Sequence, residues 1–137
     1  MRILIFVIAI SCFLLSCNKE VKLNSRIEGE WIPISLKISD NSGIGYYADT
    51  QGFLKFQKDA KKSTTGTYKI ELQYTVNGIQ KTFLENGTYT VDSDKIIRKP
   101  LNSLENKSII IYVNKEDFQL EIPNLENERY QFLLKRK

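Results

Sequence analysis

The sequence predicts an all-β fold, an antiparallel up-and-down barrel of about eight or nine strands. From Trp31 onward, apolar and polar residues alternate with a period of two, which is the spacing of a strand with one buried face. The apolar segments are short and are separated by turn-forming residues, a pattern typical of barrels and sandwiches. A chain of 137 residues has room for one such domain.

In the first part of the chain, the sequence predicts a short helix or turn and two strands. A short helix or turn is expected from Lys22 to Glu28, ahead of a strand from Trp31 to Ile38. The loop from Ser39 to Gln51 carries two glycines and two tyrosines, and we expect it to act as a lid or contact surface. The next strand is expected from Gly52 to Gln57. Its apolar spacing also suits a helix, but the glycine at its start and the lysine-rich loop after it favour a strand.

The clearest element is a hairpin centred on Asn77-Gly78. Between Thr67 and Val76, aromatic and aliphatic residues occupy every second position. Asn-Gly accepts positive φ at both central positions of a type I′ turn. The chain is therefore expected to reverse there and to continue as a strand from Ile79 to Leu84.

Turn residues also mark the later strands. A second Asn-Gly pair, Asn86-Gly87, predicts a turn before a strand from Thr88 to Val91. Asp92-Ser93-Asp94 predicts another turn, which leads into a strand from Lys95 to Arg98. The last three strands are expected at Ser108 to Val113, Asp117 to Ile122 and Arg129 to Lys135, with Pro123-Asn124 between the last two.

The residue composition argues against metal and cofactor sites. The chain has no His, one Met and two cysteines, Cys12 and Cys17, both near its start. Zinc, haem, iron–sulfur and blue-copper sites need imidazole, thiolate or thioether ligands. We therefore expect no metal, no cofactor and no disulfide downstream of Cys17.

Enzymatic activity is not expected either, because catalytic triads that use a His base are excluded. The carboxylate pairs Glu28/Glu30 and Asp92/Asp94 could in principle perform acid–base chemistry of the kind glycosidases use. Turn formation explains the Asp pair more simply, and solvent exposure beside Trp31 explains the Glu pair. A calcium site at Asp92 and Asp94 lacks the further ligands that it would need.

The charge distribution argues against a nucleic-acid partner. The chain carries 20 Lys and Arg against 16 Asp and Glu, a net charge of +4. Its small basic clusters, Lys58 with Lys61 and Lys62, and Lys135 to Lys137, form no long stripe with interleaved aromatic residues. We expect no nucleic acid to bind.

Residues 1–16 have the pattern of a secretory signal peptide. Arg2 precedes an apolar run of about 13 residues, whereas a membrane-spanning helix needs about 20. The run ends in Leu14-Leu15-Ser16-Cys17, which resembles the bacterial lipobox, where a cysteine receives a diacylglycerol and becomes the first residue of the mature protein. The resemblance implies that Cys17 is lipidated and palmitate-bearing, and that two or three acyl chains anchor the protein to a membrane.

This resemblance divides the chain into a signal peptide at 1–16, a lipidated N-terminus and tether at 17–26, and a barrel domain at 27–137. Asn18, in place of the Asp of an inner-membrane retention signal, favours the outer membrane. Lys19-Glu20 resembles the surface-export signal of Bacteroidota lipoproteins, although this stretch is equally a plain polar tether. We expect a lipid-anchored protein of the outer membrane, on its periplasmic side or at the cell surface.

Gly29-Glu30-Trp31 at the start of the first strand, and the basic residues that end the last strand, resemble the lipocalin pattern. More specifically, the chain resembles the small lipocalin-like lipoproteins of Bacteroidota. The resemblance implies that Trp31 closes one end of the barrel and that Arg136 or Lys135 lies over its ring, a cation–π contact of about 0.5–2 kcal/mol. The alternative is an ordinary core tryptophan.

Two functions suit this interpretation. The first is binding of a small apolar or amphipathic ligand inside the barrel, near the membrane. The candidate lining residues are the aromatic side chains expected to face inward: Tyr68, Tyr74, Tyr89, Phe83, Phe118 and Phe132. The alternative is a protein-contact lipoprotein, an accessory subunit or inhibitor with a solidly packed barrel, in which Tyr46 and Tyr47 contact the partner.

Overall fold

The structure, a computed structural model, describes residues 19–125 and 127–137. The expected signal peptide at 1–16, the lipidation site Cys17 and Asn18 lie outside the described residues. Within the described part, residues 19–27 are helical and nine strands follow. The strands are β1 (Gly29–Ser39), β2 (Gly45–Ala48), β3 (Thr50–Lys58), β4 (Thr65–Val76), β5 (Ile79–Asp92), β6 (Lys95–Pro100), β7 (Asn106–Val113), β8 (Asp117–Leu125) and β9 (Glu128–Arg136).

Eight of the nine strands in this part of the chain, β1 and β3 to β9, close into an antiparallel barrel. Each strand from β3 to β8 pairs with the next, and β9 returns to β1, where Trp31 lies opposite Arg136 and Ser39 opposite Arg129. The first half of β1 pairs with β3, and its second half pairs with the short strand β2. The predicted all-β up-and-down barrel is confirmed.

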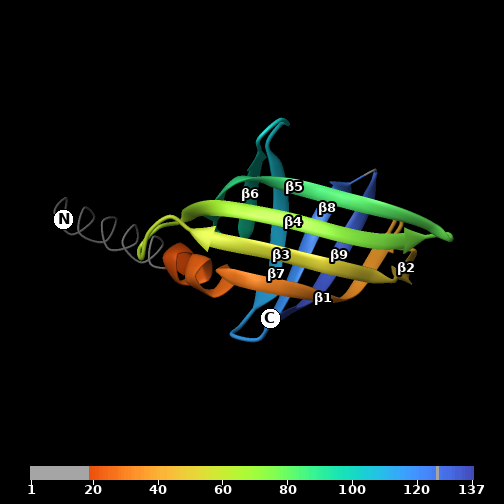
Figure 1. Cartoon of the computed structure of the whole chain (residues 1–137), viewed down its shortest axis with the longest axis horizontal. Coiled ribbons are helices and arrows are strands. Elements are labelled where there is room, and N and C mark those ends of the chain that lie inside the picture. The colour runs from red at the N-terminus through yellow and green to blue at the C-terminus, as the bar shows by residue number, and fades with distance from the viewer. Residues whose placement is uncertain (1–18, 126) are drawn as a thin grey trace, which may run out of the picture.

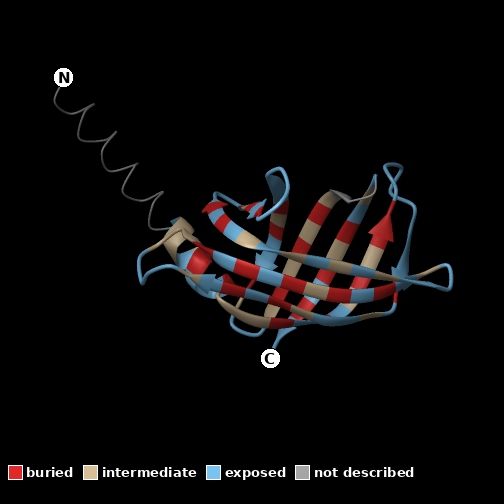
Figure 2. Cartoon of the chain, turned by 45° about the horizontal axis from the view of Figure 1, so that its top comes forward, coloured by how far each residue is buried: buried red, intermediate tan, exposed pale blue. Residues whose placement is uncertain are grey.

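The barrel is flattened into two layers. Figure 1 shows the long strands β3, β4 and β5 side by side in front, with β7, β8 and β9 crossing behind them at a steep angle. β1 belongs to both layers because it pairs with β3 and with β9. Buried and exposed residues alternate along the strands (Figure 2), since successive side chains of a strand point to opposite faces. The inward faces form one hydrophobic core.

Most of the loop expected at Ser39–Gln51 is a hairpin instead. β2 pairs with β1, so that residues 40–44 make the turn between them. Oδ1 of Asp40 accepts hydrogen bonds from the backbone N–H of Ser42 at 2.8 Å and of Ile44 at 3.2 Å, which fixes the turn. Three of the four residues of β2 are exposed, so the strand lacks the alternation by which the other strands are recognised.

The turn expected at Asn86-Gly87 does not form. β5 runs unbroken through this pair, with Asn86 opposite Lys69 and Gly87 opposite Tyr68. The physical reason is the partner strand: β4 offers twelve residues of regular alternation, and the ladder continues along all of them. The glycine serves strand pairing, because a Cβ at Gly87 would overlap the carbonyl oxygen of Lys99 on β6.

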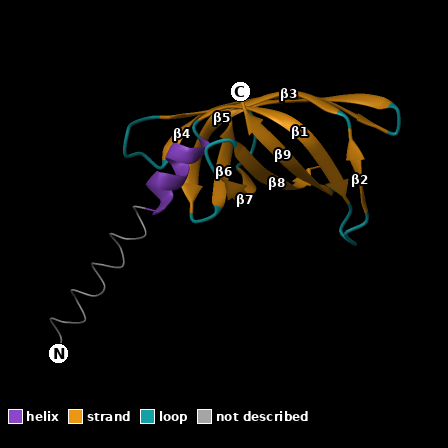
Figure 3. Ribbon diagram, turned by 90° about the horizontal axis from the view of Figure 1, so that it is seen from below, coloured by secondary structure: helices purple, strands orange, loops and turns teal. Residues whose placement is uncertain are grey.

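The helical segment, residues 19–27, begins three residues before the expected Lys22 and ends one residue before the expected Glu28. Figure 3 shows the helix at one end of the barrel, where β1 begins. Asn24 is fully buried, and its Nδ2 donates a hydrogen bond to the carbonyl oxygen of Ser63 at 2.7 Å. The helix is therefore packed onto the barrel as its cap.

Trp31 fills the barrel end under this helix. Its side chain is fully buried, and its indole N–H donates a hydrogen bond to the carbonyl oxygen of Ile27 at 2.7 Å. The ring meets Phe118 edge-on, with 5.2 Å between the ring centroids. The guanidinium carbon of Arg136 lies 4.2 Å from the centroid of the Trp31 ring. We call this end of the barrel the closed end.

Arg136 also ties the closed end together through backbone carbonyls. Its side chain donates hydrogen bonds to the carbonyl oxygens of Lys115 at 2.6 Å, Glu28 at 2.7 Å and Arg26 at 2.8 Å. Gly29 has a positive φ of 132°, and a Cβ there would overlap the guanidinium group. The glycine of the Gly-x-Trp sequence therefore leaves the space that Arg136 occupies.

Candidate functional site

The aromatic side chains predicted to line a ligand cavity face the interior of the barrel. Tyr68, Tyr74, Tyr89, Phe118 and Phe132 are buried, and Phe83 is half-buried. Toward the closed end, two of these rings pack on the buried Phe56 of β3, whose centroid lies 5.4 Å from that of Tyr89 and 6.1 Å from that of Phe118. The closed half is thus filled by its own side chains. Contact of these six residues with a ligand stays a prediction.

A buried ion pair lies beside these rings, since Arg98 is opposite Tyr89 in the β5–β6 ladder. Arg98 on β6 is 1% exposed, and its Nη1 donates to Oε1 of Glu85 on β5. Nε of Arg98 donates to the hydroxyl of Ser108 on β7 at 2.8 Å. The hydroxyl of Tyr68 on β4 donates to the same Oε1 of Glu85 at 2.8 Å. Four strands therefore contribute to one polar cluster, Tyr68, Glu85, Arg98 and Ser108, inside an otherwise apolar barrel.

The protonation states of this cluster follow from its burial. Burial lowers the pKa of Arg98 to about 10, so the guanidinium stays charged at neutral pH. Burial also raises the pKa of Tyr68, an effect that the positive charge of Arg98 opposes. The guanidinium carbon lies 5.9 Å from the centroid of the Tyr68 ring. At neutral pH the cluster therefore holds a cation and a neutral phenol that donates a hydrogen bond to Glu85.

A pocket of about 370 Å³ reaches this cluster from the solvent. It is lined by Glu85, Arg98, Glu105, Asn106, Lys107, Ile122 and Pro123. These residues lie on β5, on β6, around the start of β7 and near the end of β8, away from the closed end. We call the barrel end that carries the turns at 40–44, 77–78 and 101–105 the open end, and the pocket lies beside the last of these turns. The volume is within the range of about 300–1,000 Å³ that small-molecule sites occupy.

Further polar and apolar groups lie around the open end. Burial raises the pKa of Tyr46, the negative charge of Glu128 raises it further, and the positive charge of Lys81 lowers it, so these groups are near one another. Ile44 is 77% exposed and Tyr47 is 75% exposed. The rim therefore combines charged groups with apolar side chains that are open to solvent.

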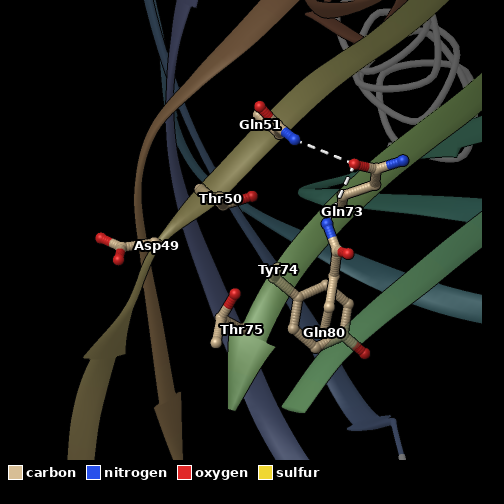
Figure 4. A pocket seen from close by; sticks show the side chains of 7 residues that line it. All are labelled: Asp49, Thr50, Gln51, Gln73, Tyr74, Thr75 and Gln80. Atoms are coloured by element: carbon tan, nitrogen blue, oxygen red, sulfur yellow. Dashed lines mark hydrogen bonds between the residues drawn. The ribbon is translucent and has the colours of Figure 1, made fainter. Parts of the chain in front are cut away.

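A second, smaller pocket of about 230 Å³ lies on the outer face of β3, β4 and β5 (Figure 4). Oε1 of Gln73 accepts hydrogen bonds from Nε2 of Gln51 at 2.9 Å and of Gln80 at 3.3 Å. Oγ1 of Thr50 is buried and has no hydrogen-bond partner among the described residues. Because the three amides bind one another across the strands, strand pairing accounts for them, and we do not assign a ligand to this face.

Of the carboxylate pairs weighed for catalysis, Glu28 and Glu30 make ion pairs with lysines, and the backbone of Asp94 takes part in strand pairing. Glu28 forms an ion pair with Lys58 at 2.9 Å, and Glu30 forms one with Lys137 at 2.6 Å. The carbonyl oxygen of Asp94 accepts a hydrogen bond from the backbone N–H of Ile110 at 2.7 Å. Among residues 19–125 and 127–137, no group of three or more His, Cys, Asp or Glu side chains could hold a metal ion. In the same ranges, every helix is too short or too polar to cross a membrane.

Sequence analysis missed the Arg98–Glu85 pair, although strand periodicity contains the signal. Arg98 lies two residues after Ile96, so both point to the same face of β6. Glu85 lies two residues after the half-buried Phe83 on β5. A turn at Asn86-Gly87 would end the strand there. Glu85 could then not be assigned to the same face as the buried Tyr89 and Val91, which follow it at even spacing. An unbroken strand places a carboxylate and a guanidinium on the same interior surface.

Comparisons with known proteins support the architecture alone. No protein-family model matches the chain, and no curated protein is significantly similar to it. The chain is similar to the solved structure of a de novo designed fluorescence-activating β-barrel, with a TM-score of 0.54 and 11% identity over 83% of this chain and 96% of that one. It is also similar to a redesigned β-barrel, with a TM-score of 0.50 and 17% identity over 83% of this chain and 94% of that one. The class shown is a closed antiparallel β-barrel.

Proposed function

We propose that the protein binds a small amphipathic molecule at the open end of its barrel. The observation that carries this proposal is the pocket of about 370 Å³ that leads from solvent to the buried Arg98–Glu85 pair. Ile122 and Pro123 give the pocket an apolar surface beside its polar groups, and a few fixed polar groups orient the ligand in small-molecule sites. One of the similar designed barrels is described as fluorescence-activating. That likeness concerns architecture, and the proposal rests on the pocket.

We further propose that the protein is a lipocalin-like lipoprotein anchored through Cys17 to the outer membrane, on its periplasmic side or at the cell surface. The lipobox-like Leu14-Leu15-Ser16-Cys17 supports this. Cys17 precedes the first described helical residue, Lys19, by two positions, and the helix caps the closed end. Such a short connection would hold the closed end toward the membrane and leave the open end accessible to ligand.

Native mass spectrometry of the membrane-extracted protein, after incubation with an extract of the cell envelope, tests ligand binding. We expect a small-molecule mass that is lost on denaturation. Asn106→Trp, which puts a large ring at an exposed position of the pocket wall, should abolish this mass. Gln73→Trp, at an exposed position on the outer face of β4, is the matched control and should retain it. A bare protein mass in the wild type would overturn the proposal.

The anchor is tested separately by metabolic labelling with palmitate. Cys17→Ala should abolish incorporation of the label and leave the signal peptide uncleaved by the lipoprotein peptidase. Cys12→Ala, five residues earlier in the apolar run, is the control and should be labelled normally. Labelling of the Cys17→Ala variant would contradict the lipidation site without affecting the ligand proposal.

A second function is favoured by the exposed apolar residues at the rim of the open end. Ile44 and Tyr47 are each about three-quarters exposed, and exposed tyrosines are frequent anchors in protein interfaces. In this alternative the barrel contacts a protein partner through the β1–β2 turn and β2. Crosslinking in cells distinguishes the two, because Ile44→Ser with Tyr47→Ser should remove a protein adduct and leave a bound small molecule in place.

A further inference from the structure

The buried ion pair at the base of the open-end pocket retains unused hydrogen-bonding capacity. Arg98 donates through Nε to Ser108 and through Nη1 to Glu85, and the structure gives its Nη2 no partner among the described residues. Oε1 of Glu85 accepts from Tyr68 and Arg98, whereas its Oε2 has no partner among those residues. Both side chains line the pocket. A donor and an acceptor are therefore both available to a molecule in it.

The formal charges of the pocket wall balance. Arg98 and Lys107 are positive, and Glu85 and Glu105 are negative. Lys107 and Glu105 are exposed and form no ion pair within the described residues, so the solvent screens them. Arg98 is 1% exposed and the Glu85 side chain 12% exposed, so these two dominate the local field. The wall accordingly favours neither a net anion nor a net cation.

Structural need is a weak explanation for this pair. Removing two charges from water costs about as much as their mutual attraction returns, so apolar side chains of similar volume are often equally stable in such positions. A buried pair that also faces a solvent-connected pocket, with a free donor and a free acceptor, is better explained by recognition of a polar group.

We propose that the pocket binds the uncharged head group of an amphipathic molecule, a group such as a primary amide that donates and accepts hydrogen bonds side by side. The carbonyl oxygen of the ligand would accept from Nη2 of Arg98, and its N–H would donate to Oε2 of Glu85. Ile122 and Pro123 supply apolar contact for the adjoining hydrocarbon. A carboxylate would face Glu85, and an ammonium group would face Arg98. This inference rests on the proposed ligand-binding function and specifies its ligand.

A series of eight-carbon ligands with different head groups tests the proposal on the full-length protein. Octanamide, octanoate and octylamine are titrated into the isotope-labelled protein, and the backbone amide shifts of the pocket residues are followed by NMR. We expect octanamide to bind about tenfold more tightly than either ion, a difference of about 1.4 kcal/mol. Equal affinity for all three would overturn the head-group proposal and leave the ligand-binding function standing. Absence of binding by all three would overturn both.

Two charge variants supply an independent readout. Glu85→Gln keeps an acceptor for Tyr68 and leaves the charge of Arg98 unopposed, so octanoate should become the preferred ligand. Glu121→Gln is the control: Glu121 is on β8 but faces outward and pairs with Arg129 at 3.6 Å, and its removal should leave the ligand order unchanged. An unchanged order in Glu85→Gln would overturn the proposal. If Glu85→Gln fails to fold, the comparison of the three ligands on the wild type remains decisive.

Discussion

The hydroxyl of Tyr89 donates a hydrogen bond to Oδ1 of Asn24 at 2.6 Å, across 65 positions of the chain. Tyr89 is on β5 and Asn24 is on the N-terminal helix, and both are buried. Nδ2 of Asn24 completes the contact by donating to the carbonyl oxygens of Ser63 at 2.7 Å and Thr65 at 3.3 Å. A single amide thus connects the helix to two strands and to the loop before β4. The helix is therefore expected to unfold together with the barrel.

Tyr89→Phe removes this hydrogen bond and leaves Oδ1 of Asn24 buried without a donor. We expect the free energy of unfolding to fall by about 1–2 kcal/mol, because an unsatisfied buried acceptor keeps its desolvation cost. Urea denaturation followed by circular dichroism measures the change. Tyr47→Phe, at a position 75% exposed, is the control and should shift stability by less than about 0.5 kcal/mol. Equal stability of the two variants would show that the contact contributes nothing.

The buried tyrosines predict a loss of stability at alkaline pH. Burial raises the pKa of Tyr89 and of Tyr68 above the ordinary value of 10.0, so the folded state keeps protons that the unfolded chain releases. The stability that they contribute is complete below pH 10 and falls as the pH rises beyond it. Arg98 acts in the opposite sense, because burial lowers its pKa to about 10. The comparison is therefore made between variants.

Tyr89→Phe isolates the tyrosine contribution to this pH dependence. Between about pH 9 and pH 11, the variant should lose less unfolding free energy than the wild type, since it lacks one of the groups that titrate. Urea midpoints measured at several pH values provide the test. Parallel curves for the two proteins would mean that Tyr89 titrates alike in the folded and unfolded states.

Strand periodicity was sufficient to predict the barrel, because alternation reports burial of one face directly. It failed where that signal was absent or contradicted by a local one. β2 has three exposed residues out of four and was expected to be a loop. At Asn86-Gly87, the local turn preference was outweighed by the ladder to β4, which is a tertiary effect that depends on a partner strand elsewhere in the sequence.

The candidate site was less accessible to sequence reasoning than the fold. Aromatic residues were identified as inward-facing, and the structure places them in the core. The contact between Arg98 and Glu85 depends on the register between β5 and β6. That register pairs Gly87 with Pro100, and it cannot be predicted once a turn is assumed at Asn86-Gly87. Such a pair can be recognised in a sequence when a charged residue is an even number of positions from the buried residues of its strand.

Gly87→Ala tests why β5 carries a glycine where a turn was expected. A Cβ at this position would overlap the carbonyl oxygen of Lys99, so the two strands must separate and the protein should lose about 1–3 kcal/mol of stability. Gly78→Ala is the comparison. A Cβ at Gly78 would meet no neighbouring atom, so the stability lost in this variant comes only from holding alanine at a positive φ of 77°. Thermal unfolding of both variants measures the difference. A smaller loss for Gly87→Ala than for Gly78→Ala would contradict a steric role.

Arg136 and Trp31 make the closed end accessible to spectroscopy, because Trp31 is the single tryptophan of the chain. Arg136→Lys keeps the positive charge but loses the planar fork that reaches three carbonyl oxygens and covers the ring. We expect a loss of about 1–2 kcal/mol, with tryptophan emission shifted to longer wavelength as water reaches the indole. Trp31→Ala should cost about 3–5 kcal/mol, the range for large aromatic side chains in cores.

Arg129→Lys is the matched control for Arg136→Lys. Arg129 is on the same strand as Arg136 but in an outward-facing pair with Glu121, so its replacement should leave both the emission and the unfolding midpoint unchanged. If Arg136→Lys behaves like Arg129→Lys, the closed end is held by the buried indole and the helix alone, and the cation over the ring contributes no measurable stability.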